Sequence, residues 1–290
     1  MTRLRRAIDE AAGTLATAGI DSARVDAELL AAHTARVDRG MLRFHEPDDA
    51  FYVDYRALVD ARSRRIPLQH LTASAAFGPV VLEVGPGVFI PRPETEALLE
   101  WVLKSVQQPL SSEPVVVDLC TGSGALAVSL ARQWPTATVL AVDDSDAALS
   151  YARRNAHLYA KDSGLRFVEA DVTAPGLLPE LDGRVDLLVA NPPYIPDGAV
   201  LEPEVAEHDP HHALFGGPDG MAVVAAIVDL AARWLRPGGR FAVEHDDSTS
   251  EQTVELLRAT TLFEEIVPRH DLAGRPRFVT AIRVEHEERR

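Results

Sequence analysis

The sequence predicts an α/β protein, in which a mostly parallel sheet has helices on both faces and follows a small helical bundle. The main observation is a set of short apolar runs that mostly end in an acid or an amide and are separated mainly by helical stretches: VVVDL, ATVLAVD, LRFVEAD, VDLLVAN and RFAVEH. This alternation is typical of a parallel sheet with two buried faces. The last two runs, FEEIVPRH and RPRFVTAIRV, lie too close together for a crossover helix, so we expect an antiparallel edge pair.

Residues 1 to about 65 have apolar residues at helical spacing in three stretches. The first ends at Gly19, the second follows a cap at Asp21 or Ser22, and the third begins near Asp48. Beyond them, FGPVVLEVGPGVFIP contains two β-rich runs around a Gly-Pro-Gly turn, which predicts a hairpin. Residues 107–114, QQPLSSEP, are expected to form an exposed connector.

Length and composition describe an ordinary globular protein. With 290 residues, 46% of them hydrophobic and 25% charged, the chain can form one large or two medium domains. The single Cys120 excludes an internal disulfide and fits a reducing compartment. No window approaches about 18 consecutive apolar residues, and the N-terminus lacks the apolar core of a signal peptide. We therefore expect a cytoplasmic protein with no membrane span.

The net charge of −15 is unevenly distributed. Residues 1–65 hold 11 Lys and Arg against 11 Asp and Glu, so the rest of the chain holds 29 − 11 = 18 basic and 44 − 11 = 33 acidic residues. An acidic main domain argues against direct nucleic-acid binding, which depends on neutralising phosphates. It suits a basic protein partner, or it serves solubility alone.

Three strand ends carry candidate ligand groups. Gly122 and Gly124 follow the first strand and precede a helix, so this loop either lets a ligand approach the backbone or packs tightly. It lacks the G-x-G-x-x-G dinucleotide fingerprint. Asp143 ends the second strand, where an acid can accept both hydroxyls of a ribose or cap the next helix. The third strand ends at Asp171, followed by Val172; these two residues could contact an adenine edge and face, or form an ordinary loop.

The fourth strand ends in Asn191-Pro192-Pro193-Tyr194. The prolines restrict the backbone and end the strand. An Asn side-chain oxygen and a backbone carbonyl can accept the two hydrogens of a planar amine or amide, and Tyr194 offers a flat packing surface. This corner predicts a site that holds an –NH2 group; the structural alternative is a proline-rich strand cap.

Over essentially its full length the chain resembles the bacterial release factor glutamine methyltransferases, the HemK/PrmC family. The segments that carry the resemblance are RRIPLQHLTASAAFG, VFIPRPETEALLE, VVDLCTGSGALAVSLA, AVDDSDAALSYARRNA, VDLLVANPPYIP, HHALFGGPDGM and DLAGRPRFV. The resemblance implies a class I methyltransferase fold with a seven-stranded sheet in residues 93–290, a hairpin linker in 73–92 and a helical recognition domain in 1–72. It implies S-adenosylmethionine as donor, S-adenosylhomocysteine as product, and the Gly-Gly-Gln glutamine of class 1 release factors as acceptor.

The resemblance also implies roles by position. The donor site takes in the loop and strand ends already described, together with Asn191 and with Phe89 as a wall: Cys120, Thr121, Gly122, Ser123, Gly124, Asp143, Asp171 and Val172. The catalytic and acceptor-binding residues are those of the fourth strand end, with Arg92 and Glu94 as further members: Asn191, Pro192, Pro193 and Tyr194.

The chain departs from the family's usual residues at four positions. Cys120 replaces a common glycine, so its backbone is expected to avoid positive φ. Asp209 stands where Glu often precedes Pro210, Val172 where an aromatic residue can occur, and Asp246 where glycine is frequent. These changes leave the Asn-Pro-Pro-Tyr corner intact.

Other polar clusters and other functions are less favoured by the sequence. Three histidines near Asp209 look like metal ligands by number, but Pro210 breaks the helix that would align them, and we expect no metal. The run Arg62–Arg65 is expected to be a solvated helix end. The rival functions are an adenine exocyclic-amine methyltransferase, which would need a basic surface, and a non-catalytic donor-binding regulator of translation.

Overall fold

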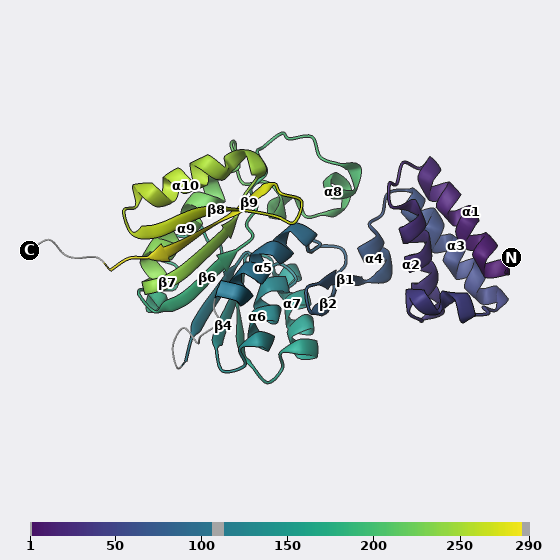
Figure 1. Cartoon of the computed structure of the whole chain (residues 1–290), viewed down its shortest axis with the longest axis horizontal. Helices are drawn as coiled ribbons and strands as arrows, with labels where there is room; N and C mark the ends of the chain where they lie inside the picture. The colour runs from purple at the N-terminus through teal and green to yellow at the C-terminus, as the bar shows by residue number, and fades with distance from the viewer. Residues whose placement is uncertain (1, 106–112, 286–290) are drawn as a thin grey trace, which may run out of the picture. The chain divides into compact units, whose positions relative to one another are not determined.

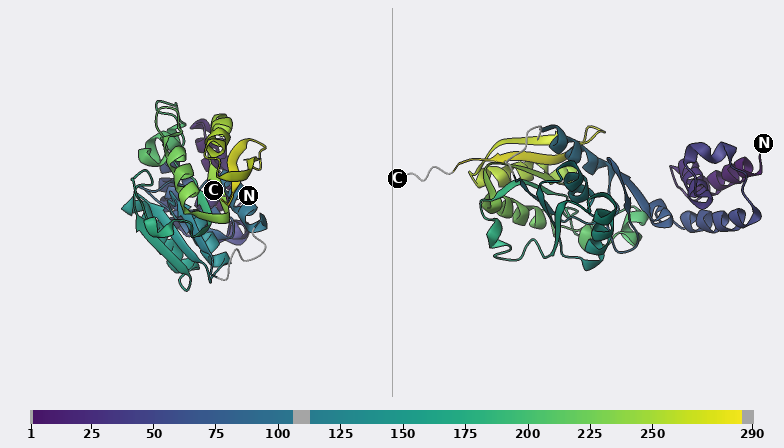
Figure 2. Two further views of the ribbon diagram at one scale, coloured as in Figure 1. Left: turned by 90° about the vertical axis from the view of Figure 1, so that its left-hand side faces the viewer. Right: turned by 90° about the horizontal axis from the view of Figure 1, so that it is seen from below.

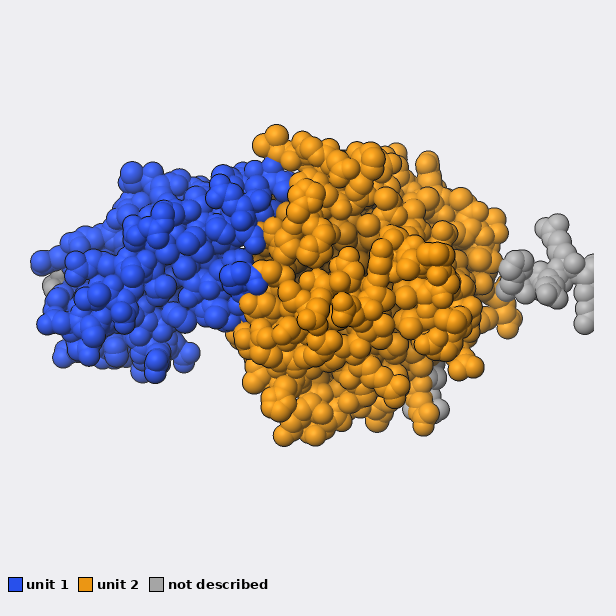
Figure 3. Space-filling view, turned by 180° about the vertical axis from the view of Figure 1, so that it is seen from behind, with its two compact units in different colours: residues 1–74, 84–86, 201–208 blue, residues 75–83, 87–200, 209–290 orange. Residues whose placement is uncertain are grey.

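The computed structural model describes residues 2–105 and 113–285. Most of the expected connector at residues 107–114 therefore lies outside the described residues. The described chain divides into two compact units, which are coloured separately in Figure 3. The first comprises residues 1–74, 84–86 and 201–208, and the second comprises residues 75–83, 87–200 and 209–290.

The first unit is a helical bundle, as the apolar spacing predicts. Its helices are α1 (Arg3–Thr17), α2 (Ala23–Ala35), η1 (Arg39–Phe44), α3 (Asp49–Ser63), α4 (Leu68–Thr72) and α8 (Pro203–His208). The Asp48 side chain caps α3 by accepting the Phe51 N–H, and Ser22 occupies the N-cap of α2. Buried apolar residues from α1, α2 and α3, among them Leu15, Leu30 and Tyr55, form one core.

The expectation that Arg62–Arg65 forms a solvated helix end is wrong for Arg62 and Arg65. The Arg62 guanidinium is buried, lies 2.7 Å from Asp26 on α2 and lies 3.0 Å from Glu204 on α8. Arg65 pairs with Glu204 at 3.2 Å and donates to the Gly19 carbonyl at 2.6 Å. Only Arg64 matches the expectation, since it makes an exposed pair with Asp60. Helical spacing places Arg62 on the face of α3 that packs against α2, where burial requires an acidic partner.

The linker contains a hairpin, but it is not the predicted one and lies one strand earlier in the chain. Strands β1 (Ser74–Phe77) and β2 (Val80–Glu83) are joined at Gly78 and Pro79, not at Gly85-Pro86-Gly87. Gly78 has a φ of +49°, which suits a tight two-residue turn. The run after Gly87 forms no strand. Instead, β2 contacts α7, where Asn155 bonds both the N–H and the carbonyl of Glu83.

The second unit is built on a seven-stranded sheet of order β5-β4-β3-β6-β7-β9-β8. Its strands are β3 (Val115–Leu119), β4 (Thr138–Asp143), β5 (Gly164–Glu169), β6 (Val185–Ala190), β7 (Leu235–Glu244), β8 (Phe263–His270) and β9 (Pro276–Arg283). Strands β3 to β7 pair in parallel, and β9 pairs antiparallel to both β7 and β8. The expected antiparallel pair is thus confirmed. The third strand ends at Glu169, two residues earlier than the sequence suggested.

Helices cover both faces of this sheet (Figures 1 and 2). Their bounds are α5 (Pro93–Ser105), α6 (Ala125–Gln133), η2 (Pro179–Leu181), α7 (Asp146–Tyr159), η3 (His211–Ala213), α9 (Ala222–Trp234), η4 (Asp247–Thr249) and α10 (Ser250–Ala259). Helices α6 and α7 pack together against β3 to β5, whereas α9 and α10 pack together against the β6–β9 side.

The strand register brings the predicted site residues to one edge. Leu119 pairs with both Val142 and Ala190, and Ala190 pairs with Val243. The residues that directly follow these paired residues in the chain therefore lie next to one another, at one edge of the sheet. The chain order also reverses between β3 and β6, because β4 and β5 extend on one side of β3 and β6 begins the other side. Such a switch point is where open α/β sheets bind ligands.

Candidate functional site

The Gly-rich loop between β3 and α6 has a left-handed backbone conformation at three positions. The φ angles of Cys120, Gly122 and Gly124 are +58°, +57° and +84°. The expectation that Cys120 avoids positive φ is therefore wrong. The chain turns directly after β3 ends at Leu119 to reach α6 at Ala125, and Cys120 takes a left-handed backbone angle in that turn. A Cβ at Gly122 would meet no atom within 4 Å, whereas one at Gly124 would lie 3.2 Å from Ala152. Gly122 thus faces open space, and Gly124 lets α6 and α7 pack closely.

Asp143 organises this loop from the end of β4. One carboxylate oxygen accepts the Gly122 N–H at 2.8 Å, and the other accepts the Ser145 N–H at 3.0 Å. Ser145 itself caps α7 by accepting the Ala148 N–H. Burial raises the pKa of Asp143, while the two backbone donors oppose that rise. Each oxygen keeps a lone pair for a further donor, so the residue fits a ligand that presents two hydroxyl groups.

Asp118 belongs to this region although it was not predicted from the sequence. It lies in β3, is buried, and accepts hydrogen bonds from the Thr121 hydroxyl at 2.6 Å and the Ala127 N–H at 3.0 Å. Burial raises its pKa to about 7, although these two bonds oppose the rise. The only sequence signal was an acid inside an otherwise apolar strand. Asp118 holds the two ends of the Gly-rich loop together.

The two residues predicted at the third strand end are placed differently from each other. Asp171 is exposed, and its carboxylate accepts both the N–H and the hydroxyl of Thr173, which lowers its pKa. Val172 is buried in the core cluster beneath the sheet edge. The Ala170 N–H donates to the Asp143 carbonyl at 2.9 Å, so this loop is anchored beside the Gly-rich turn.

The Asn-Pro-Pro-Tyr corner is held by two residues outside the motif, Thr95 on α5 and Glu244 at the end of β7. Asn191 Nδ2 donates to Thr95 Oγ1 at 3.0 Å, and Thr95 Oγ1 donates to Glu244 Oε2 at 2.8 Å. The Tyr194 hydroxyl donates to Glu244 Oε1 at 2.9 Å. Neither partner was predicted from the sequence. The signal for Glu244 was present, since it ends a strand run with an acid, but nothing in the sequence linked it to Asn191.

Two glycines shape the same corner from the opposite side. A Cβ at Gly216 would lie 2.5 Å from the Pro193 carbonyl oxygen, and one at Gly220 would lie 2.2 Å from the Tyr194 carbonyl oxygen. The Ile195 N–H donates to the Leu214 carbonyl at 2.9 Å and closes this part of the loop. Only glycine fits at these two positions, so the backbone of the corner is fixed by the FGGPDG segment.

Electrostatics single out Glu244 among the corner residues. Its side chain is buried, and burial raises its pKa to about 7; Glu94 adds to the rise, while Thr95, Tyr194 and Arg277 oppose it. Burial and the nearby Glu244 raise the pKa of Tyr194, which stays neutral and donates its proton. Burial and nearby carboxylates also raise the pKa of Cys120, so its thiol is no nucleophile at neutral pH.

The remaining predicted residues lie just before α5. The Arg92 guanidinium lies 4.9 Å from the centre of the Phe89 ring and forms an ion pair with the buried Asp209. The pair links the IPRPETE segment to the loop that follows the corner. Glu94 stands in the first turn of α5, one residue from Thr95. Asp209 therefore replaces the usual Glu without loss of an acidic partner for Arg92.

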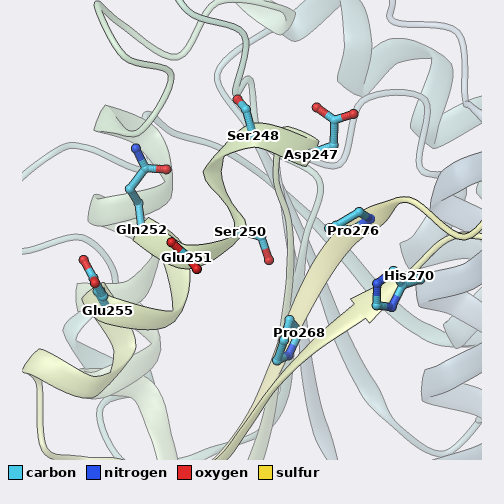
Figure 4. A pocket seen from close by; sticks show the side chains of 9 residues that line it. All are labelled: Asp247, Ser248, Ser250, Glu251, Gln252, Glu255, Pro268, His270 and Pro276. Atoms are coloured by element: carbon cyan, nitrogen blue, oxygen red, sulfur yellow. The ribbon is translucent and has the colours of Figure 1, made fainter.

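Three other kinds of feature concern the described residues: a metal site, a membrane span and a second pocket. Within residues 2–105 and 113–285, no group of three His, Cys, Asp or Glu side chains is placed to hold a metal ion, and no helix is long and apolar enough to cross a membrane. A depression between α10 and the β8–β9 pair is lined by mostly exposed residues such as Glu251, Gln252 and His270 (Figure 4). It contains none of the predicted site residues.

Comparison with known proteins assigns both units. Residues 6–72 match the PrmC N-terminal domain, and residues 86–208 match the methyltransferase small domain. The chain is 62% identical over 288 residues to a release factor glutamine methyltransferase of Mycobacterium tuberculosis (strain ATCC 25618 / H37Rv), covering 98% of this chain and 92% of the relative. The chain belongs to the release factor glutamine methyltransferase family. It is an enzyme, an S-adenosylmethionine-dependent methyltransferase, and the family and fold predicted from the sequence are confirmed.

Two further relatives are named for different methyl acceptors. A release factor glutamine methyltransferase of Corynebacterium glutamicum is 42% identical, covering 97% of this chain and 99% of its own. A 4-amino-L-phenylalanine/4-methylamino-L-phenylalanine methyltransferase of Streptomyces pristinaespiralis is 41% identical, covering 89% of this chain and 88% of its own. The crystal structure of a methyltransferase from Pyrococcus furiosus, 19% identical, covers 78% of this chain and all of its own with a TM-score of 0.51, which supports the fold alone.

Proposed function

We propose that this protein transfers a methyl group from S-adenosylmethionine to the side-chain amide nitrogen, N5, of the glutamine in the Gly-Gly-Gln motif of class 1 peptide chain release factors. The observation that carries the proposal is the orientation of Asn191. Because its Nδ2 donates to Thr95, its Oδ1 is the end left to accept a hydrogen from an –NH2 group. Relatives that are 62% identical bear the name of this activity.

The donor site is assigned to the Gly-rich loop and the neighbouring strand ends. Asp143 would accept the two ribose hydroxyls through its remaining lone pairs, and the open approach at Gly122 would admit the methionine part. Cys120, Thr121, Ser123 and Gly124 complete that loop. Asp171 and Val172 would border the adenine, and Phe89 would wall the pocket. The sulfonium of the bound donor supplies an electrophilic methyl group.

The acceptor site is assigned to Asn191, Pro192, Pro193 and Tyr194, with Arg92 and Glu94 beside them. A glutamine amide is a poor nucleophile, because its nitrogen lone pair is delocalised into the carbonyl. The Asn191 Oδ1 and the Pro192 carbonyl would each accept a hydrogen bond from one N–H of the glutamine amide. Together they would turn the amide nitrogen toward the methyl carbon of the donor. Positioning of this kind can contribute about 7–11 kcal/mol. The same acceptors stabilise the positive charge that develops on nitrogen, and the proton leaves to water after transfer.

The proposed partner is a class 1 release factor. Because a release factor acts in translation, the enzyme would work in the cytoplasm. The net charge of −15 favours a basic protein surface over nucleic acid, which weakens the adenine alternative. A non-catalytic regulator has no need for an acceptor corner with a fixed amide.

Mass spectrometry of a purified release factor tests the proposal. The enzyme is incubated with labelled S-adenosylmethionine and either the release factor or a variant whose Gly-Gly-Gln glutamine is alanine. We expect one methyl group on that glutamine and none on the variant. Free 4-amino-L-phenylalanine and adenine-containing oligonucleotides serve as competing acceptors. Methylation of either one in place of the glutamine would overturn the assignment.

The variant Asn191→Ala tests the corner itself. By analogy with removal of one preorganised electrostatic partner, it should slow single-turnover transfer roughly 10²–10³-fold while donor affinity stays nearly unchanged. An unchanged rate with saturating donor and release factor would mean that the corner is only a strand cap.

A further inference from the structure

We propose that Glu244 is a positioning residue for methyl transfer, which acts through Thr95 to fix the direction of the Asn191 amide and acts directly to hold Tyr194. The inference rests on the proposed function of Asn191 and Tyr194. Its basis is one buried carboxylate whose two oxygens are each bonded to a different part of the acceptor corner.

The donor and acceptor rules determine the direction of the chain of bonds. An ionised carboxylate can only accept, so the single hydroxyl proton of Thr95 points to Glu244 Oε2 at 2.8 Å. Thr95 Oγ1 can then only accept from Asn191, and the 3.0 Å bond must run from Nδ2. The two ends of an Asn amide have nearly the same shape. Without this constraint, either end could face the acceptor, and the –NH2 end would repel a glutamine –NH2 group.

Tyr194 is held by the other oxygen of the same carboxylate. Its hydroxyl donates to Glu244 Oε1 at 2.9 Å. The register supports this arrangement, because Val243 pairs with Ala190 and places Glu244 beside Asn191 at the sheet edge. Thr95 and Glu244 are 3% and 1% exposed, so water cannot replace either bond. Burying a carboxylate is costly, and an apolar residue would fill the space without organising the corner.

The protonation state of Glu244 decides whether this chain persists. The groups around it are Thr95 and Glu94 on α5, Tyr194 in the corner and Arg277 on β9. A protonated Glu244 must donate from one oxygen, so Thr95 or Tyr194 loses its acceptor. The Thr95 proton can then turn toward Asn191 and reverse the amide. Since the ionised form is the one that orients the corner, the transfer rate should fall as the pH drops through the pKa of Glu244 and should level off at the lower rate of the protonated form.

Single-turnover kinetics with saturating donor and release factor test the hydroxyl. Thr95→Val keeps the shape but removes the hydroxyl, and it should lower the transfer rate about tenfold, while Thr95→Ser restores most of it. Thr253→Val is the matched control, because Thr253 is equally buried and its hydroxyl bonds a helix carbonyl. Unfolding temperature and donor affinity should change alike in both valine variants. A wild-type rate in Thr95→Val would overturn the inference.

The pH profile tests the carboxylate. Glu244→Gln should lose the acid limb of the rate between pH 6 and 8. Asp186→Asn removes another buried carboxyl, one that accepts the Val115 N–H at 2.8 Å outside the donor and acceptor sites, and it should keep that limb. If Glu244→Gln keeps the wild-type limb, the inference is wrong.

An NMR measurement separates this inference from the proposed function. The Asn191 side-chain amide, assigned by its absence in Asn191→Ala, is followed in ¹⁵N-labelled protein without release factor. Its shift should titrate with Glu244 in the wild type and stay constant in Glu244→Gln. If the release factor glutamine is not methylated, the proposed function fails, while this titration still decides the inference. An Asn191 amide that is indifferent to pH and to Thr95→Val would overturn it.

Discussion

The Asp143 carboxylate at the end of β4 accepts the backbone N–H of Gly122, 21 residues earlier in the chain, at 2.8 Å. The bond joins two strand ends and fixes the loop that faces the proposed donor. A single side chain therefore both shapes the loop and remains available to bind. Its loss should affect two measurable properties, loop stability and donor affinity.

Asp143→Ala should weaken S-adenosylmethionine binding by about 1.5–3 kcal/mol for each charge-assisted bond that is lost. Isothermal titration calorimetry measures the change. The matched control is Asp144→Ala, since Asp144 is exposed and next in the chain, and it should leave the affinity unchanged. Equal affinities for Asp143→Ala and wild type would remove Asp143 from the donor site.

Asp118 should make stability depend on pH in a definite direction. Burial raises its folded-state pKa to about 7, above the unfolded value of about 3.9. Between these values the folded state binds the proton more tightly, so stability falls as pH rises from about 4 to about 7 and then levels off. Urea unfolding of wild type and Asp118→Asn, compared at pH 5, 6, 7 and 8, isolates this contribution. The free energy of unfolding of the wild type, relative to that of Asp118→Asn, should decrease steadily up to pH 7. Parallel pH profiles of the two proteins would contradict the prediction.

Cys120 offers a test of backbone strain. A non-glycine residue in the left-handed region costs roughly 1–2 kcal/mol, and Cys120 has a φ of +58°. We therefore expect Cys120→Gly to be more stable than Cys120→Ala, although glycine normally loses more entropy on folding. Thermal unfolding of the two variants measures the order. The opposite order would mean that the loop relaxes when the sulfur is removed.

Arg62 should be essential to the helical unit. Arg62→Ala leaves Asp26, whose side chain is 5% exposed, without its cation, and removal of one partner of a buried pair costs about 3–5 kcal/mol. Glu204 is 26% exposed on the other side of the same guanidinium, so Glu204→Ala should cost no more than about 1 kcal/mol. Hydrogen exchange of α2 and α3 gives both values within this unit. Similar losses in the two variants would contradict the burial argument.

Local features of the chain were predictable where backbone chemistry alone decides them. The order of short apolar runs and helical stretches predicted the parallel strands, and two closely spaced runs predicted the antiparallel pair. As expected, β6 ends just before the two prolines, with Ala190 as its last residue. The predictions that were wrong concern the turn of the hairpin, the φ angle of Cys120 and the burial of Arg62. The burial of Arg62 depends on Asp26 and Glu204, which no short stretch of sequence contains together.

The sequence by itself determined the identity of the corner, Asn191 to Tyr194, because proline removes a backbone donor and restricts φ wherever it stands. Only the tertiary structure decided which residues orient it. Thr95 and Glu244 are 149 positions apart, and the partners Asn191 and Thr95 are 96 apart. Their meeting follows from strand order and register, in which Val243 pairs with Ala190. Hydrogen bonds between distant side chains require that three-dimensional register, and residue spacing along the chain does not contain it.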